Sequence, residues 1–194
     1  MARYRGPKWR ISRRENFDIF GNDKWKKRAF PPGMHNTKKG RPSNYAIQFR
    51  EKQKLKRIYG LLEKQFRRIY QKASREKGNT GIRFLQLLEM RLDNVSYRLG
   101  YAKSRNQARQ FVSHGHIFVN GKRINIPSYT LTVNDTIEFD PKFAKTEVSK
   151  LIIAETKKLN KVSWLNNGQI TMLPPRDTID QAIRENLVVE FYSR

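Results

Sequence analysis

Residues 103–126 read KSRNQARQFVSHGHIFVNGKRINI, and this stretch decides the fold. Ser104 stands where a helix would begin, and a glutamine three residues later gives the spacing of a capping box. Gly115 ends the helical spacing, because glycine readily adopts the left-handed conformation that follows a helix. Asn120-Gly121 separates two short apolar runs and predicts a type I′ hairpin turn. The stretch therefore predicts a basic helix and a hairpin that together present cations to a nucleic acid.

The whole chain is strongly basic. Among its 194 residues, 41 are Lys or Arg and 17 are Asp or Glu, which gives a formal net charge of +24. Residues 1–80 hold 24 basic and 6 acidic residues, whereas residues 81–140 and 141–194 each contribute a net charge of +3. Lysine and arginine bind phosphates by displacing counterions, so this excess predicts a polyanionic partner. The alternative is a merely soluble basic protein, and the uneven distribution of charge argues against it.

Several classes of function are excluded by what the sequence lacks. It contains no cysteine, and therefore no disulfide and no thiolate metal site. His114 and His116 could share one face of a strand, but structural zinc needs four ligands and the third histidine, His35, is distant. No nucleotide-binding or hydrolase motif is present, and no apolar run is long enough to span a bilayer. We therefore expect no enzyme, no metal, no cofactor and no membrane insertion.

The pattern of breaks and apolar spacing predicts an α+β protein. We expect an extended basic arm (1–42), a helical N-terminal domain (43–83), an RNA-binding module with a small, mostly antiparallel sheet (84–140), and a C-terminal helix and strands (141–194). Within these segments, the spacing predicts helices over 43–60, 62–78, 84–99 and 148–159. It predicts strands at 131–133, 137–139, 162–165, 169–173 and 187–192.

The N-terminal half interleaves aromatic rings with cations. In the arm, six rings either stack on RNA bases or hold the arm on its own protein, and the sequence leaves both readings open: Tyr4, Trp9, Phe17, Phe20, Trp25 and Phe30. Beyond the arm, only Glu51 and Glu63 accompany nine cations on the helices, which should repel one another unless phosphates screen them: Arg50, Lys52, Lys54, Lys56, Arg57, Lys64, Arg67, Arg68 and Lys72. The RNA-binding positions predicted here are Arg3, Tyr4, Arg5, Lys8, Arg13, Arg14, Arg50, Lys54, Arg57, Arg67 and Arg68.

These stretches, in this order, resemble one family: the fourth protein of the small ribosomal subunit, of bacterial or organellar type. The residues that carry the resemblance are ARYRGPK (2–8), PGMH (32–35), YAIQFREKQKL (45–55), LLEMRLDNVSYRLG (87–100), SHGHI (113–117) and VEFYSR (189–194). Two departures stand out. Many members carry a metal-binding cysteine cluster in the arm, which is missing here, and residues 15–25 look unlike common versions.

The resemblance implies a fold and a function. It implies a structural constituent of the small subunit with an alpha-L-type RNA-binding module, in which residues 141–194 pack on the preceding domains. Such a protein would bind rRNA first at a multi-helix junction of the 5′ region and nucleate assembly. It would lie near the channel through which mRNA enters, and would influence translational accuracy with the fifth small-subunit protein. The implied protein is a monomer within the ribosome.

The module's motif implies further RNA-facing or structure-setting positions: Arg91, Arg98, Lys103, Ser104, Arg105, Gln107, Arg109, His114, Gly115, Asn120 and Lys122. The match begins at residue 3 and leaves no room for a cleaved import signal. The expected location is therefore the cytoplasmic ribosome of a bacterium or an organellar ribosome.

Two other classes of protein use the same module. Pseudouridine synthases and tyrosyl-tRNA synthetases need a separate catalytic domain, and the flanking segments supply none of its motifs. A free RNA chaperone or a factor that rescues stalled ribosomes would not need the long N-terminal match. A moderate salt wash separates these cases, because a core constituent remains on the subunit and a rescue factor is removed.

Overall fold

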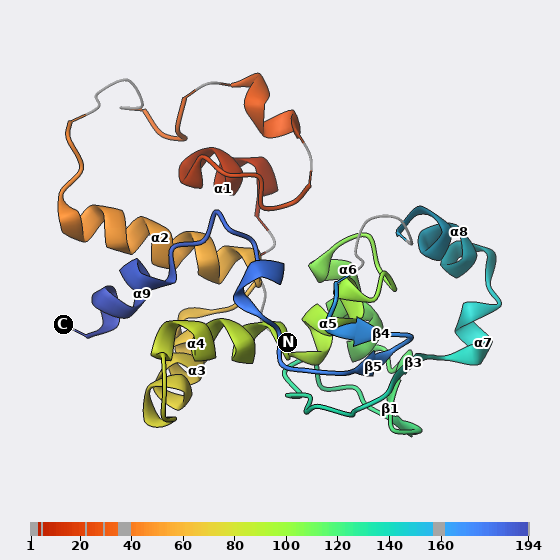
Figure 1. The fold of residues 1–194 in the computed structure, drawn as a ribbon. Helices are drawn as coiled ribbons and strands as arrows, with labels where there is room; N and C mark the ends of the chain where they lie inside the picture. The colour runs from red at the N-terminus through yellow and green to blue at the C-terminus, as the bar shows by residue number, and fades with distance from the viewer. Residues whose placement is uncertain are drawn as a thin grey trace. The chain divides into compact units, whose positions relative to one another are not determined.

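A computed structural model describes the following part of the chain: residue 4 and residues 6–21, 23–28, 30–34, 40–156 and 162–193. Helices dominate these residues and the strands form two small antiparallel sheets, which confirms the predicted α+β class (Figure 1). None of the helices within the described ranges is both long and apolar enough to cross a membrane.

The chain divides into two compact units. The N-terminal unit contains residues 1–81 and 181–194, and the central unit contains residues 82–180. The N-terminal unit is therefore built from two segments that lie far apart in the sequence.

The N-terminal unit is helical. Its elements are α1 (Lys8–Glu15), the 3₁₀ helix η1 (Asp23–Lys27), α2 (Asn44–Ile58), α3 (Glu63–Arg75), the start of α4 (Thr80–Glu89) and α9 (Glu185–Tyr192). Helix α9 lies alongside α2 (Figure 1), and its Val188 is completely buried. The ring of Tyr192 stacks on Tyr70 of α3 with 4.6 Å between ring centroids. Residues from the end of the sequence thus complete the packing of its N-terminal helices.

Residues 8–15 form a helix where the sequence predicted an extended arm. Ile11 and Ser12 are buried, and the side chain of Glu15 is only 1% exposed. Its carboxylate pairs with Arg50, at 3.3 Å, and with Arg57, both on α2. A helix this short is unstable in isolation, so these contacts with α2 account for its formation.

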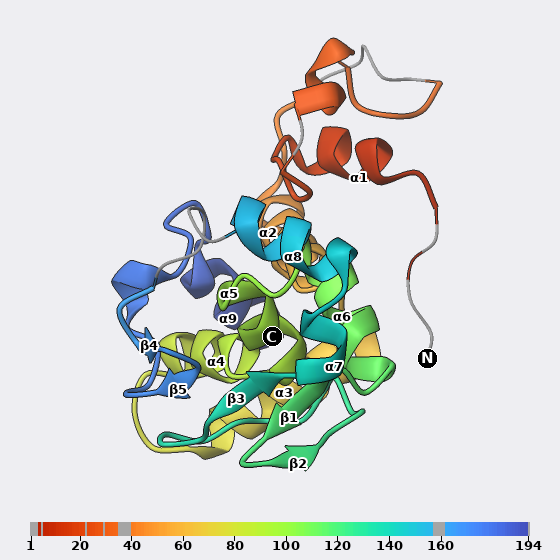
Figure 2. The ribbon, with the colours of Figure 1, turned by 90° about the vertical axis from the view of Figure 1, so that its right-hand side faces the viewer.

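The central unit combines short helices with the two sheets. Its elements are the rest of α4, α5 (Leu92–Arg98), α6 (Arg105–Ser113), β1 (Ile117–Val119), β2 (Lys122–Arg123), β3 (Ile137–Phe139), α7 (Pro141–Ala144), α8 (Glu147–Thr156), β4 (Leu165–Asn166), β5 (Gln169–Ile170) and the 3₁₀ helix η2 (Arg176–Thr178). Figure 2 shows the three-stranded sheet, in which β1 lies between β2 and β3. Strands β4 and β5 form the second sheet.

One hydrophobic core joins the helices of the central unit to its strands. Val112 of α6, Ile117 of β1 and Ile137 of β3 are fully or almost fully buried, together with Trp164 and Ile170 near the second sheet. Ile117 and Ile137 lie on the same face of the sheet, because alternate residues of a strand face the same side. The core thereby fixes α6 and the β1–β2 hairpin relative to each other.

The predicted helix cap, helix end and hairpin turn within residues 103–126 are confirmed. The Ser104 hydroxyl accepts a hydrogen bond from the Gln107 backbone N–H at 3.3 Å, which caps α6. Gly115 has φ +74°, as the predicted helix end requires. Asn120 and Gly121, with φ +50° and +74°, form the turn between β1 and β2.

The helix predicted over 84–99 and the strand predicted at 131–133 differ from the structure. The helix predicted over 84–99 is broken at Met90 and Arg91, where Arg91 bridges to Thr130 and the Leu131 N–H bonds to the Met90 carbonyl. The helix is therefore interrupted at Met90, whose carbonyl bonds to segment 130–131 and not to the next turn of a helix. Residues 131–133, predicted as a strand, lie outside the named strands, although Leu131 is buried.

The strand predicted over 187–192 is wrong, because these residues belong to helix α9. Their β-branched and aromatic side chains favour a strand locally. In the helix, however, Val188 and Tyr192 are four residues apart and therefore share one face. That face packs in the N-terminal unit, so tertiary contacts override the local preference.

Glu63 gives the N-terminal unit an acid-sensitive contribution to stability. Burial raises the pKa of Glu63, but hydrogen bonds from Lys52, Lys56 and Tyr192 outweigh it and hold the pKa at about 2, below the ordinary 4.5. A lowered folded-state pKa means that the stabilisation is complete above pH 4.5 and is lost as the pH falls towards 2. Since the Glu63 side chain is 45% exposed, solvent screening limits the effect to about 1 kcal/mol.

The variant Glu63→Gln tests this contribution. We expect its free energy of unfolding to be lower than that of the wild type at pH 7, with the difference shrinking at pH 3. Urea titrations at the two pH values measure it. An equal difference at both would show that the ion pairs do not stabilise the fold.

Candidate nucleic-acid interface

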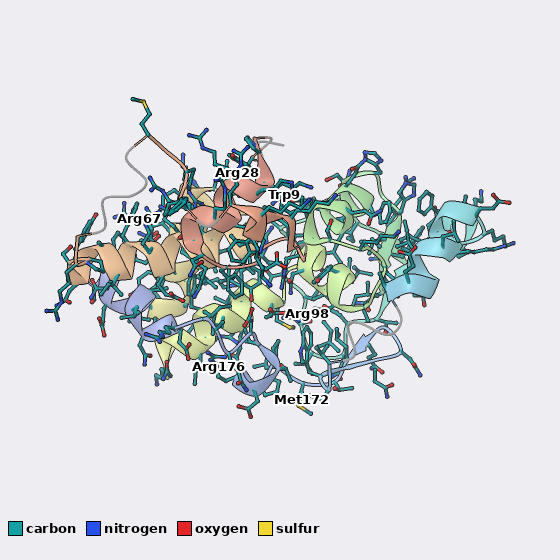
Figure 3. All side chains as sticks on the ribbon, turned by 90° about the horizontal axis from the view of Figure 1, so that it is seen from above. Trp9, Arg28, Arg67, Arg98, Met172 and Arg176 are labelled. Atoms are coloured by element: carbon teal, nitrogen blue, oxygen red, sulfur yellow. The ribbon has the colours of Figure 1, made fainter. Side chains whose placement is uncertain are left out.

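Helix α3 presents a row of cations along its exposed face. The row, called here the α3 stripe, consists of Lys64, Arg67, Arg68, Lys72 and Arg75. Its spacing of three and four residues places all five on one side of the helix, over about 16 Å. Within the described part of the chain none of them forms an ion pair, and all five are exposed; Arg67 is labelled in Figure 3. The opposite face of α3 buries Phe66 and Ala73.

The cations of α2 are arranged differently, because carboxylates accompany them. Arg50 and Arg57 pair with Glu15 of α1, and Lys54 pairs with Glu51 at 2.8 Å. Lys52 and Lys56, on the same helix, both bond to Glu63 at the start of α3, at 2.8 and 2.9 Å. The mutual repulsion predicted for the nine cations is thus relieved on α2 by acidic side chains and remains on α3.

The predicted positions of the arm are partly described. Arg3 and Arg5 lie outside the described residues. Tyr4 is exposed, and the ammonium of Lys8 lies over the Phe20 ring, 5.7 Å from its centroid. Arg13 bonds to the Phe30 carbonyl at 3.4 Å.

The arm's rings differ in their surroundings within the chain. Phe17 and Phe20 lie under the lysines Lys54 and Lys8. Tyr4 and Phe30 are more than half exposed and available to a partner.

Two predicted RNA-binding arginines of the central unit are buried. Arg91 and Arg109 are 4% and 6% exposed. Arg91 bonds to both carboxylate oxygens of Asp93, at 3.1 and 2.9 Å, and Arg109 approaches the same carboxylate at 3.8 Å. These side chains join α5 to α6 in the interior of the unit and do not form part of its exposed basic surface.

A second network connects α4, α5 and α6 near the surface. The carboxylate of Glu89, whose side chain is 1% exposed, accepts two hydrogen bonds from Arg98, at 3.1 and 2.9 Å. It also accepts one from the Asn94 amide at 2.7 Å. The Asn94 oxygen in turn accepts a hydrogen bond from Arg105 Nε at 2.8 Å. Arg98, labelled in Figure 3, and Arg105 are partly exposed, so their positions at the surface are set from within.

The start of α6 is fixed by the capping residues. The Gln107 side chain accepts a hydrogen bond from the Lys103 N–H at 2.8 Å, and Ser104 caps the helix as described above. The exposed ammonium of Lys103 lies 2.5 Å from the carboxylate of Glu155. Exposed pairs of this kind are weak and readily exchanged for another anion.

The hairpin exposes Lys122 and holds the end of α6. Arg123, which the sequence analysis did not single out, donates to the carbonyls of Gly115 and His114, at 2.7 and 3.0 Å. It satisfies carbonyls that a helix end leaves without partners. His114, predicted to face RNA, is exposed at this end of α6.

Asn120 has a structural role. Its side chain bonds to Asp135 at 2.8 Å and accepts a hydrogen bond from the Thr136 N–H at 2.9 Å. Burial raises the pKa of Asp135, but hydrogen bonds from Thr132 and Asn120 outweigh it, so the pKa lies below its ordinary value. The hairpin turn is therefore tied to the loop that precedes β3.

The full α3 stripe was only partly recognised from the sequence. Arg67 and Arg68 were predicted as RNA-binding residues, Lys64 and Lys72 were placed only on a basic face, and Arg75 was missed. The spacing of three and four residues from Lys64 to Arg75 was the available signal.

Comparisons with known proteins agree with this geometry. Residues 3–89 match the family model described as the ribosomal protein S4/S9 N-terminal domain, and residues 90–137 match that of the S4 domain. The chain is similar to proteins named small ribosomal subunit protein uS4 from Halothermothrix orenii (45% identical), Opitutus terrae (48%) and Clostridium beijerinckii (46%), with 100% of both chains covered in each case. Nearly half of the residues are thus shared over the whole length, and the chain belongs to the uS4 family of small ribosomal subunit proteins.

Proposed function

We propose that this chain binds rRNA in the small ribosomal subunit through two basic surfaces. One is the α3 stripe of the N-terminal unit. The other, on the central unit, consists of Arg98, Lys103, Arg105, His114 and Lys122. The α3 stripe carries the proposal. Its five exposed cations have no carboxylate partners in the described residues and repel one another, and the phosphates of a polyanion would screen this repulsion.

Shape, rather than base sequence, is what these surfaces can recognise. A-form RNA has a deep, narrow major groove, so proteins contact its phosphates and 2′-hydroxyls. A rigid helix with cations at regular intervals fits the regular phosphates of such a duplex. Arginine suits this role because its planar guanidinium can bind phosphate oxygens bidentately.

We further propose the finer role that the family resemblance implies. The chain binds early at a multi-helix junction in the 5′ region of the rRNA and nucleates assembly there. It lies near the path of incoming mRNA and influences accuracy together with the fifth small-subunit protein. An assembly reaction from rRNA and purified proteins tests nucleation, since adding this chain last should yield fewer complete subunits than adding it first.

The triple variant Arg67→Gln, Arg68→Gln and Lys72→Gln tests the α3 stripe. Glutamine preserves helix propensity, so the variant removes charge and leaves α3 intact. We expect affinity for 5′-region rRNA to fall about tenfold or more, and the plot of log K against log salt to become shallower by about 2 to 3. Filter-binding titrations of the full chain over a range of salt concentrations measure both quantities.

A matched control removes the same charge elsewhere. The variant Lys142→Gln, Lys145→Gln and Lys150→Gln changes three exposed lysines of the α7–α8 segment, none of which belongs to either proposed surface. We expect it to retain most of the affinity and slope. Equal losses in the two variants would mean that net charge alone determines binding, and would refute a specific surface on α3.

A further inference from the structure

We propose that the N-terminal unit contains a pocket for an unpaired nucleotide of RNA at the start of α2. The proposal rests on the RNA-binding function above and adds a position where a base is held, in addition to phosphates. A hollow of about 400 Å³ lies here, lined by Arg14, Pro31, Tyr45, Ala46, Phe49 and Arg50. Its volume falls within the range of small-ligand sites.

Tyr45 provides a fixed and accessible ring. It lies one turn before Phe49, with 6.1 Å between ring centroids and an angle of 11° between ring planes. Phe191 of α9 contacts both rings, at 5.7 and 5.9 Å, which restrains them. Tyr45 nevertheless remains 53% exposed. An exposed ring held in one orientation is what proteins use to stack an unpaired base.

The charges around the hollow favour a nucleotide over an apolar partner. Burial raises the pKa of Glu15, while the charges of Arg57, Arg50, Arg14 and Lys54 lower it in part. These four cations are accompanied by two carboxylates, Glu15 and the Glu51 partner of Lys54, and Arg14 and Arg50 also line the hollow. The surplus positive charge suits the phosphate of the same nucleotide whose base stacks on Tyr45.

Ala46 keeps the hollow open and offers a way to close it. A larger side chain at this position would fill the space, and leucine does so without loss of helix propensity. The Ala46 backbone N–H, which bonds to the Ser43 hydroxyl at 3.3 Å, is unaffected. Ala46→Leu therefore blocks the pocket, Tyr45→Leu removes the stacking ring, and Tyr45→Phe keeps that ring as the matched control.

The probe is a single-stranded oligouridylate with one central 2-aminopurine, whose fluorescence is quenched when the base stacks. We expect the wild type and Tyr45→Phe to quench it at saturation, and Tyr45→Leu and Ala46→Leu to lose most of the quenching. Their affinity for the probe should fall about tenfold, the effect of losing one stacked base. The salt dependence should be unchanged, because no phosphate contact is removed.

The same titration separates this proposal from the proposed function. Variants of the α3 stripe should weaken binding of the probe but leave the quenching at saturation unchanged. Binding with equal quenching in the wild type, Tyr45→Leu and Ala46→Leu would overturn the pocket alone. If the wild type bound neither the probe nor rRNA at low salt, the proposed RNA-binding function itself would be overturned. Far-UV circular dichroism confirms that each variant is folded.

Discussion

Removal of residues 181–194 is expected to unfold the N-terminal unit and to leave the core of the central unit intact. The deleted segment supplies two buried apolar side chains, Ile183 and Val188. Burial of each contributes about 1.5 to 3 kcal/mol. The polar contacts that disappear with it include Gln48 to Glu190 at 2.8 Å, Tyr192 to Glu63 at 2.8 Å, the Arg184 N–H to Glu51 at 3.0 Å and Lys54 to the Ala182 carbonyl at 2.7 Å.

The expected loss is comparable with the whole stability of a small domain, about 5 to 15 kcal/mol. We therefore expect α2 and α3 to lose their protection, while Trp164 stays buried in an intact central core. Amide hydrogen exchange resolved by residue distinguishes the two units. Deletion of Ser193 and Arg194 alone is the control and should leave protection unchanged. Retained protection of α2 in the longer deletion would contradict the prediction.

The variant Asp93→Ala is expected to destabilise the central unit by about 3 to 5 kcal/mol, the usual cost of leaving a buried charge without its partner. Asp93 is 5% exposed and is the carboxylate shared by Arg91 and Arg109. Its removal leaves two buried guanidinium groups without that carboxylate between α5 and α6.

An exposed ion pair provides the control for this variant. Glu155 pairs with Lys103 at the surface, where both side chains are at least half exposed, so Glu155→Ala should cost less than about 1 kcal/mol. Urea unfolding followed by tryptophan fluorescence, with Trp164 in the central core, measures both. A similarly small cost for Asp93→Ala would mean that water or another side chain replaces the lost carboxylate as the partner of the two arginines.

The parts of the fold that the sequence predicts well are those that local chemistry determines. The Ser104 cap, the Gly115 helix end and the Asn120-Gly121 turn each depend on residues within a few positions of one another. The family membership likewise confirms a ribosomal constituent rather than an enzyme. The chemistry of these short segments was sufficient to place the helix and hairpin of the central unit.

The differences arise where distant segments decide the structure. The break at Met90 and Arg91 depends on residues 130–131, and the apolar spacing of 84–99 continues through it without interruption. The helix α1 depends on α2, which supplies the partners of Glu15. The burial of Arg91 and Arg109 depends on Asp93 and could not be read from charge counts. In each case the deciding contact is formed only in the folded chain.

The network around Glu89 has a consequence for the entropy of binding. A flexible arginine loses rotamer freedom when it binds an anion, at a cost of about 0.5 to 1.5 kcal/mol per side chain. Arg98 and Arg105 have given up much of that freedom already, since Glu89 and Asn94 hold their guanidinium groups in the free protein. Preorganised in this way, they should contribute more affinity per charge than the solvent-exposed side chains of α3.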